Sequence, residues 1–219
     1  MASPAPVVLF DLDGTLIDSA PGIFATLAHA FAQVGAELPP HEVLRGWIGP
    51  PFRQTFPHVL GDDAVRIEAA IEHYRLRFEE SGWREHTLYP GIEALVGALA
   101  QAALPLAIVT TKPQRQAERI LAHLPFGAAF TRVYGADIGS SHCAKAPMIG
   151  QALADFGVPA SGATMIGDRH FDIAGARAND VRALGVAWGF GSREELLSAG
   201  ANAIAADPAD LGHLLGIVP

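Results

Sequence analysis

Short apolar runs alternate with amphipathic helical patterns along most of the 219-residue chain, and this alternation limits the possible fold classes. The strand-like runs lie at 6–10, 104–110, 163–167 and 183–188, with weaker ones at 131–134 and 202–205. Pro113 sits just inside one predicted helix, and Ser192 with Glu195 matches a capping box at the start of another. Strands that alternate with helices predict an α/β fold, with a doubly wound, mostly parallel, Rossmann-like sheet covered on both faces.

Residues 16–88 interrupt this alternation. Apolar residues with helical spacing mark one helix around Phe31 and another around Phe78. Because no convincing strand lies between them, we expect an inserted all-helical cap subdomain over 16–88. Residues 1–15 and 89–219 would then form a single α/β core domain, and the chain is long enough for a core with an insertion.

Polar and acidic residues directly follow the strong strand-like runs. In VVLFDLDGTLIDS, Asp11 follows four apolar residues, and Asp13 comes two positions later. Clustered carboxylates repel one another and resist burial, so a core gains little from this arrangement. Thr110 follows LAIV and Asp168 follows TMIG. Because open α/β sheets bind ligands at the carboxyl ends of their strands, we expect these residues to form one site.

The residue types in this site indicate metal-assisted phosphoryl transfer. Several carboxylates around one point need a cation, and oxygen ligands without cysteine or paired histidine suit Mg²⁺. Lys145 and nearby hydroxyl groups would offset the charge of phosphate oxygens. The chain has no Walker-type GxxxxGK[ST] loop and no glycine-rich nucleotide fingerprint. It therefore supplies its own nucleophile or activates water, and Asp11 is placed to accept phosphate as an aspartyl-phosphate.

Four motifs in this order resemble those of the haloacid dehalogenase superfamily, specifically its phosphoglycolate phosphatase-like branch. They are DLDGTLIDS at 11–19, Thr110 followed by TKP at 111–113, Lys145, and GDRHFD at 167–172. With the inserted helical cap, the resemblance covers nearly the whole chain. It implies a Mg²⁺-dependent phosphatase that hydrolyses a small phosphorylated metabolite through an aspartyl-phosphate intermediate.

The resemblance also implies roles for the aspartates. Asp11 would be the nucleophile and a metal ligand. Asp13 would protonate the leaving alkoxide, then deprotonate the attacking water, and would bind metal through its backbone carbonyl. Asp168 would be the remaining protein ligand to Mg²⁺.

Other matching residues would hold the phosphate group. Thr110, the backbone of Thr111 and Lys145 would contact phosphate oxygens. Asp172 would orient Lys145 or a metal-bound water from outside the ligand shell. The segment KAPM departs from the family pattern because the proline that often directly follows the lysine is absent.

Several other functions remain open at this point. A nucleoside 5′-monophosphatase would use the same site on a different metabolite. A sugar phosphomutase would use nearly the same residues, although Thr15 in place of valine disfavours it. A dehalogenase of the superfamily does not need Asp13, which is present here. A non-catalytic binding module on this fold would not need the complete set of catalytic residues.

The cap is expected to close over the site and to select the substrate, because the insertion begins and ends beside the strand edge that carries Asp11. Arg45 and Arg53 flank the segment GWIGPPF and are the candidate substrate contacts, with a solvated helix face as the alternative. A carboxylate on the substrate would pair with either arginine in a bidentate contact.

Composition excludes several partners. The net charge of −8 argues against a nucleic-acid polymer as ligand, since phosphate backbones need clustered lysine and arginine. The single cysteine, Cys143, excludes an internal disulfide, and its surroundings lack a catalytic cysteine signature. The N-terminal MASPAP lacks a basic segment and the apolar runs are too short to span a bilayer, so we expect a cytoplasmic protein without membrane contact. The oligomeric state is not readable from the sequence.

Overall fold

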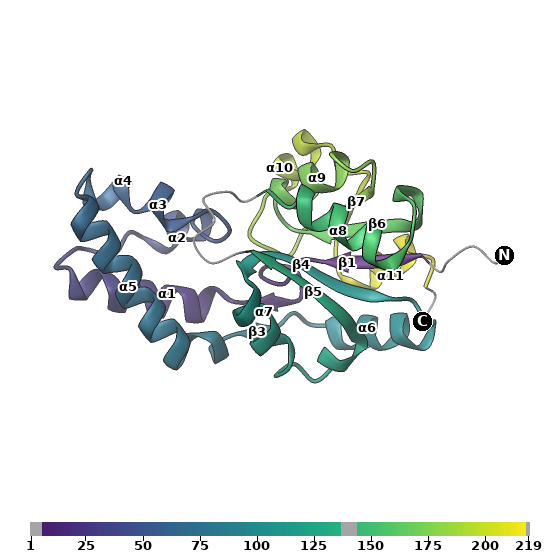
Figure 1. Cartoon of the computed structure of the whole chain (residues 1–219), viewed down its shortest axis with the longest axis horizontal. Coiled ribbons are helices and arrows are strands. Elements are labelled where there is room, and N and C mark those ends of the chain that lie inside the picture. Colours follow the sequence, from purple (N-terminus) through teal and green to yellow (C-terminus); the bar gives the residue numbers. More distant parts are fainter. Residues whose placement is uncertain (1–5, 137–143, 218–219) are drawn as a thin grey trace. The chain divides into compact units, whose positions relative to one another are not determined.

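The structure is a computed structural model that describes residues 6–136 and 144–217, and it divides into two compact units (Figure 1). One unit takes the chain up to Ile17 and from Leu88 onward, and the other consists of Asp18–Thr87. Cys143 lies outside the described residues, as does nearly all of the N-terminal MASPAP segment.

A six-stranded sheet forms the centre of the first unit. Its strands are β1 (Val7–Phe10), β4 (Leu106–Pro113), β5 (Phe130–Ala136), β6 (Ala163–Gly167), β7 (Arg182–Val186) and β8 (Ala203–Ala205). They lie in the order β5-β4-β1-β6-β7-β8, and each neighbouring pair is parallel. The chain therefore adds strands first on one side of β1 and then on the other. This topology confirms the predicted doubly wound, Rossmann-like sheet.

Helices cover both faces of this sheet (Figure 1). One face carries α8 (Ala146–Phe156), α9 (His170–Arg177) and α10 (Arg193–Ala199), and the other carries α6 (Ile92–Gln101) and α7 (Gln114–Leu121). The remaining elements are α11 (Pro208–Leu214) and the 3₁₀ turns η2 (Gly127–Ala129) and η3 (Ala160–Gly162). Val7 and Leu9 of β1 pack in one buried cluster with Ile149 of α8. Phe10 points to the opposite face, where its ring contacts that of Phe130 edge-on.

The second unit is helical. Its elements are α1 (Ala20–Gln33), α2 (His41–Gly46), α3 (Phe52–Thr55), α4 (Pro57–Leu60), α5 (Ala64–Glu80) and η1 (Gly82–Arg84). Aromatic rings fill its interior, and successive contacts join Phe31, Trp47, Phe52, Phe56, Tyr74 and Phe78. The Arg77 side chain links α5 to α1 by donating to the Thr26 hydroxyl at 2.7 Å. These contacts support the predicted apolar faces around Phe31 and Phe78.

Two local details differ from the sequence interpretation. The range 16–88 contains two-residue strands at its ends, β2 (Ile17–Asp18) and β3 (Thr87–Leu88), which pair with each other. Two residues are too few to produce a recognisable alternation of polar and apolar side chains. Pro113 ends β4 and immediately precedes α7, so it is the N-cap residue rather than the first helical residue.

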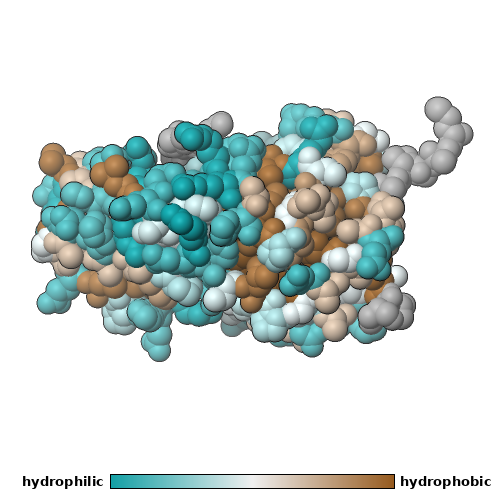
Figure 2. All heavy atoms as spheres, turned by 90° about the horizontal axis from the view of Figure 1, so that it is seen from below, coloured by the Kyte–Doolittle hydropathy of each residue, from teal (hydrophilic) through white to brown (hydrophobic). Residues whose placement is uncertain are grey.

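The face seen in Figure 2 carries hydrophilic and hydrophobic patches side by side. None of the helices in the described part of the chain is long and apolar enough to cross a membrane.

Candidate active site

The predicted site residues of the α/β unit lie at one edge of the sheet. Asp11 directly follows β1, and Asp168 directly follows β6, the neighbouring strand. Thr110 and Thr111 lie within β4 on the other side of β1, because this strand continues past its predicted end. Parallel strands place their carboxyl ends at the same edge, so residues far apart in the chain meet there.

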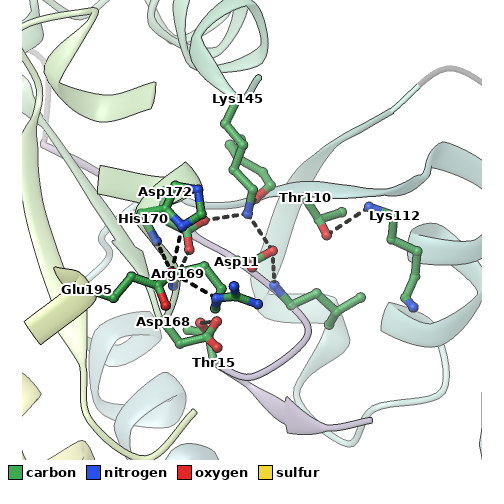
Figure 3. A network of polar contacts seen from close by, with 12 residues as sticks. Asp11, Thr15, Thr110, Lys112, Lys145, Asp168, Arg169, His170, Asp172 and Glu195 are labelled. Atoms are coloured by element: carbon green, nitrogen blue, oxygen red, sulfur yellow. Dashed lines mark hydrogen bonds and ion pairs between the residues drawn. The ribbon is translucent and has the colours of Figure 1, made fainter. Parts of the chain in front are cut away.

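Lys145 lies between two of the aspartates (Figure 3). Its Nζ atom is 2.7 Å from Oδ1 of Asp11 and 2.5 Å from Oδ1 of Asp172, and it also donates to the carbonyl of Val109. Burial by itself would lower the pKa of Lys145, but the two carboxylates outweigh this effect and raise the pKa above its ordinary value. Lys145 is therefore a permanently charged group inside the site.

Asp11 and Asp168 are buried carboxyl groups with raised pKa values. Burial is the main cause in both, and it raises the pKa of Asp11 to about 7 and the pKa of Asp168 to about 8. Lys145 opposes the shift at Asp11, whereas the charge of Asp172 adds to it. Groups of this kind need a nearby positive charge to stay ionised near neutral pH.

Both carboxylate oxygens of Asp172 have partners within the site. Oδ1 pairs with Lys145, and Oδ2 accepts a hydrogen bond from the backbone N–H of Arg169 at 2.9 Å, closing the first turn of α9. Carboxylate oxygens of Asp11, Asp168 and Asp172 all lie within 4.8 Å of one another. This group fits a metal site made only of oxygen ligands, and Asp172 also contacts Lys145 directly.

Asp13 and Thr110 are joined through a lysine that the sequence interpretation missed. Nζ of Lys112 is 3.0 Å from Oδ2 of Asp13, and the backbone N–H of Lys112 donates to the Thr110 hydroxyl at 3.2 Å. Thr111 lies between Thr110 and Lys112 in β4 and is partly buried. The signal was present in the sequence, because Lys112 is the central residue of the TKP segment.

The loop after β7 was also missed. The backbone N–H of Phe190 donates to Oδ2 of Asp168 at 2.8 Å. A Cβ atom at Gly14, Gly189 or Gly191 would clash with Asp168, and Gly14 also has a φ of +80°. Only glycine permits the backbone to approach Asp168 this closely. The strand-end rule, applied to the WGFG segment that follows β7, would have indicated this loop.

Two more contacts tie the first strand loop to this region. The Thr15 hydroxyl lies 3.3 Å from Oδ1 of Asp168, and its backbone carbonyl accepts a hydrogen bond from the indole N–H of Trp188 at 3.1 Å. Both oxygens of the Asp168 carboxylate therefore have hydrogen-bond donors. This surrounding holds Asp168 in one orientation at the end of β6.

The predicted capping box of α10 is only half formed. Ser192 accepts a hydrogen bond from the backbone N–H of Glu195 at 3.0 Å, as predicted. The Glu195 carboxylate does not return to Ser192 but binds the side chain of Arg169 and both the backbone and the ring of His170. A charge-assisted contact to arginine is stronger than a second capping bond, which explains the difference. Glu195 thus stabilises the loop that carries Asp168.

The two arginines predicted to contact substrate lie in the helical unit. Arg45 is in α2, and Arg53 is in α3. Arg53 makes a two-bond ion pair with Glu68, with distances of 2.6 and 2.8 Å, and both side chains are more than half exposed. Any substrate role of Arg53 therefore has to compete with this exposed pair, which is weak because water screens it.

Comparisons with known proteins agree with these motifs. A family model described as haloacid dehalogenase-like hydrolase matches residues 8–186. A 5′-nucleotidase from Pseudomonas aeruginosa is 37% identical over 210 residues, which cover 96% of this chain and 95% of that protein. A phosphoglycolate phosphatase from Rhodospirillum rubrum is 31% identical over 218 residues, covering 95% and 90%. The predicted resemblance to the phosphoglycolate phosphatase-like branch is thereby confirmed.

Two further proteins extend the comparison. The tyrosine-protein kinase PtkA of Mycobacterium tuberculosis is 36% identical over 186 residues, which cover 84% of this chain but only 63% of the kinase. The crystal structure of a predicted phosphatase from Clostridium acetobutylicum has a TM-score of 0.88 and 33% identity, and the match covers 99% of this chain and 100% of that one. This chain therefore belongs to the haloacid dehalogenase-like hydrolase family.

Proposed function

We propose that this chain, a phosphoric monoester hydrolase of the haloacid dehalogenase-like family, cleaves a small phosphorylated metabolite with Mg²⁺ and an aspartyl-phosphate intermediate. The observation that carries the proposal is the buried group of Asp11, Asp168 and Asp172, with Lys145 bound to the first and the last of these. Buried carboxylates destabilise a fold unless cations offset their charge. A site for Mg²⁺ and phosphate accounts for this grouping.

The donor set fits Mg²⁺. Asp11 and Asp168 would hold the ion through carboxylate oxygens, and Asp13 would add its backbone carbonyl. The lysines Lys112 and Lys145 pair with three of the four aspartates of the site, so one divalent cation would bring the formal charge of the four carboxylates and two ammonium groups to zero. When bound, Mg²⁺ would stabilise the negative charge that develops on the transferred phosphoryl group.

Asp11 is built to be the nucleophile. Its Oδ1 accepts the Leu12 N–H at 2.8 Å and pairs with Lys145, whereas no described residue donates a hydrogen bond to Oδ2. Oδ2 is therefore the oxygen that attacks phosphorus. The new bond joins Oδ2 to phosphorus, the ester bond between phosphorus and the leaving oxygen breaks, and the phosphoryl group remains on Asp11.

Asp13 would move the protons of both steps. Its carboxyl group donates a proton to the leaving alkoxide in the first step, so that an alcohol departs. In the second step Asp13 takes a proton from a water molecule whose oxygen attacks phosphorus. The bond between phosphorus and Asp11 then breaks, which releases inorganic phosphate and regenerates the carboxylate. Lys145, the Thr110 hydroxyl and the Thr111 N–H would hold the phosphate oxygens meanwhile.

The substrate class follows from the relatives by analogy. Phosphoglycolate and nucleoside 5′-monophosphates are the two candidates, and the higher identity to the 5′-nucleotidase supports the nucleotide. Both substrates present a phosphomonoester to the same site and differ only in the leaving group. The cap, Asp18–Thr87, would contact the leaving group and so distinguish between the two substrates.

A substrate panel tests the proposal. Purified protein should release inorganic phosphate from p-nitrophenyl phosphate and, more efficiently, from one member of a panel of nucleotides, phosphoglycolate and sugar phosphates. Excess EDTA should abolish the release, and added Mg²⁺ should restore it. No Mg²⁺-dependent turnover on any member would overturn the proposal. An isomerised sugar phosphate without free phosphate would indicate a mutase instead, and tight binding without turnover would indicate a binding module.

The same panel tests the cap as the selectivity element. For a carboxylate-bearing substrate, Arg45→Ala or Arg53→Ala should raise KM, whereas activity on p-nitrophenyl phosphate should stay nearly unchanged because it has no carboxylate. If neither arginine variant changes the two activities differently, these arginines do not select the substrate and selectivity depends on other residues.

Metal-dependent stability should vary with pH. The raised pKa values of Asp11 and Asp168 mean that the metal-free folded state holds protons that the unfolded chain has lost above about pH 4. Stability of the metal-free protein should therefore fall as pH rises from 5.5 toward and through the folded pKa values. Mg²⁺ binds the deprotonated groups, so its stabilising effect should be larger at pH 8.5 than at pH 6.

Thermal unfolding in EDTA and in excess Mg²⁺ at both pH values measures this difference. The Asp168→Asn variant should lose most of the Mg²⁺ effect, whereas Asp62→Asn, at an exposed loop position, should retain it. Equal increases in Tm at the two pH values would contradict the assignment of these carboxyl groups to the metal.

A further inference from the structure

Lys112 and Asp13 form an ion pair that is largely shielded from water. Their charged atoms are 3.0 Å apart, and only 8% of the Lys112 side chain and 14% of the Asp13 side chain are exposed. Exposed pairs contribute little because water screens them, whereas breaking a shielded pair leaves an uncompensated charge. Lys112 lies near the end of β4, and Asp13 lies in the loop after β1, so the pair joins this strand to that loop.

The two carboxylate oxygens of Asp13 have different surroundings. Oδ2 contacts Lys112, whereas Oδ1 is buried and has no hydrogen-bond partner among the described residues. Burying a carboxylate oxygen without a donor is unfavourable, and such atoms are rare in folded proteins. An oxygen kept in this condition, inside a site for phosphoryl transfer, points to a partner that arrives with the substrate.

We propose that Lys112 is a positioning residue that binds Oδ2 of Asp13 and thereby directs Oδ1 toward the leaving oxygen of the substrate. The inference rests on the proposed function, because it assigns to Oδ1 the proton that Asp13 delivers. Without Lys112, the Asp13 side chain can rotate about its bonds, and both oxygens compete for the same position. A fixed rotamer keeps the donor in line with the ester oxygen at each turnover.

The two lysines of the site then have separate tasks. Lys145 binds Asp11 and Asp172, and Lys112 binds Asp13. Each aspartate assigned to chemistry is therefore held by its own ammonium group. The competing interpretation is that Lys112 contacts a phosphate oxygen directly, as a second cation beside Lys145.

A double-mutant cycle separates these interpretations. Lys112→Met should lower kcat about 10²-fold on an alkyl phosphate such as a nucleoside 5′-monophosphate, with little change in KM. It should have a much smaller effect on kcat/KM for p-nitrophenyl phosphate, whose leaving group needs no proton. In the Asp13→Asn background the same substitution should have almost no further effect, because the group that it positions is already gone. Lys112→Arg should recover part of the rate.

Controls address folding and charge. Arg115→Met removes a positive charge from an exposed position on the neighbouring helix α7 and should leave both activities unchanged. Thermal unfolding in EDTA measures the contribution of the Lys112–Asp13 pair to stability, independently of catalysis. Lys112→Met should destabilise the wild-type protein more than the Asp13→Asn variant. If Lys112→Met itself does not fold, two other variants replace it in the comparison. They are Lys112→Arg and the double variant Lys112→Met/Asp13→Asn, which has no unpaired carboxylate.

The outcomes of this experiment are distinguishable. Equal losses of kcat/KM on both substrates, an increase in KM for the alkyl phosphate, or additive effects in the cycle would overturn the positioning role and favour direct phosphate contact. A wild-type protein that turns over no phosphomonoester would overturn the proposed function, and the inference with it.

Discussion

Replacing Asp11 by asparagine is expected to reduce phosphate release by at least about 10⁴-fold. The amide cannot form the acyl-phosphate, and it is a weaker ligand than a carboxylate for Mg²⁺. It also leaves Lys145 with Asp172 as its remaining carboxylate partner in the described site. Steady-state phosphate release measures the loss, and single-turnover assays with radiolabelled substrate measure whether a phosphoenzyme forms.

A matched substitution shows that this loss is local. Asp62→Asn makes the same chemical change at an exposed loop position and should retain wild-type activity. Circular dichroism and thermal unfolding show whether the Asp11→Asn protein is folded. A folded Asp11→Asn variant that still forms a labelled phosphoenzyme would identify a different nucleophile.

Replacing Asp13 by asparagine should slow turnover of an alkyl phosphate by about 10²–10⁴-fold, the usual contribution of a positioned general acid or base. The loss of kcat/KM, which reports the steps up to departure of the leaving group, should be smaller on p-nitrophenyl phosphate, because nitrophenolate departs without a proton. The amide has the shape of the carboxyl group but cannot deliver a proton. With the good leaving group, the phosphoenzyme should form almost normally and then accumulate, since hydrolysis still needs a base.

Rates on the two substrates, together with the amount of trapped phosphoenzyme, check this assignment. Equal losses on both substrates, without accumulation of the intermediate, would contradict the acid–base role of Asp13. The Arg115→Met variant serves as the control, because it changes charge near β4 without touching Asp13.

The position of the candidate site could be predicted from the order of residues along the chain. An apolar run followed at once by Asp11 or Asp168 marks the carboxyl end of a buried strand. In a doubly wound sheet these ends share one edge, so the topology follows from the alternation and brings these residues together. Thr110 was located by the same argument, although β4 continues past it.

The individual contacts depend on the tertiary structure. Lys112 and Lys145 are both lysines near strand ends, and local sequence does not show that one binds Asp13 and the other Asp11 and Asp172. Periodicity describes which face of an element is apolar, but pairing depends on the register and rotamers of elements from distant parts of the chain.

The surroundings of Asp168 illustrate the same division. Its place after β6 was determined by the sequence, because a polar residue ends an apolar run there. Its hydrogen bond from Phe190 and the close approach of Gly14 and Gly189 were decided only by folding, which brings the loops after β1 and β7 against the end of β6. A local pattern specifies the type of element and the order of the strands. The fit of a buried carboxylate among backbone atoms is decided by packing in three dimensions.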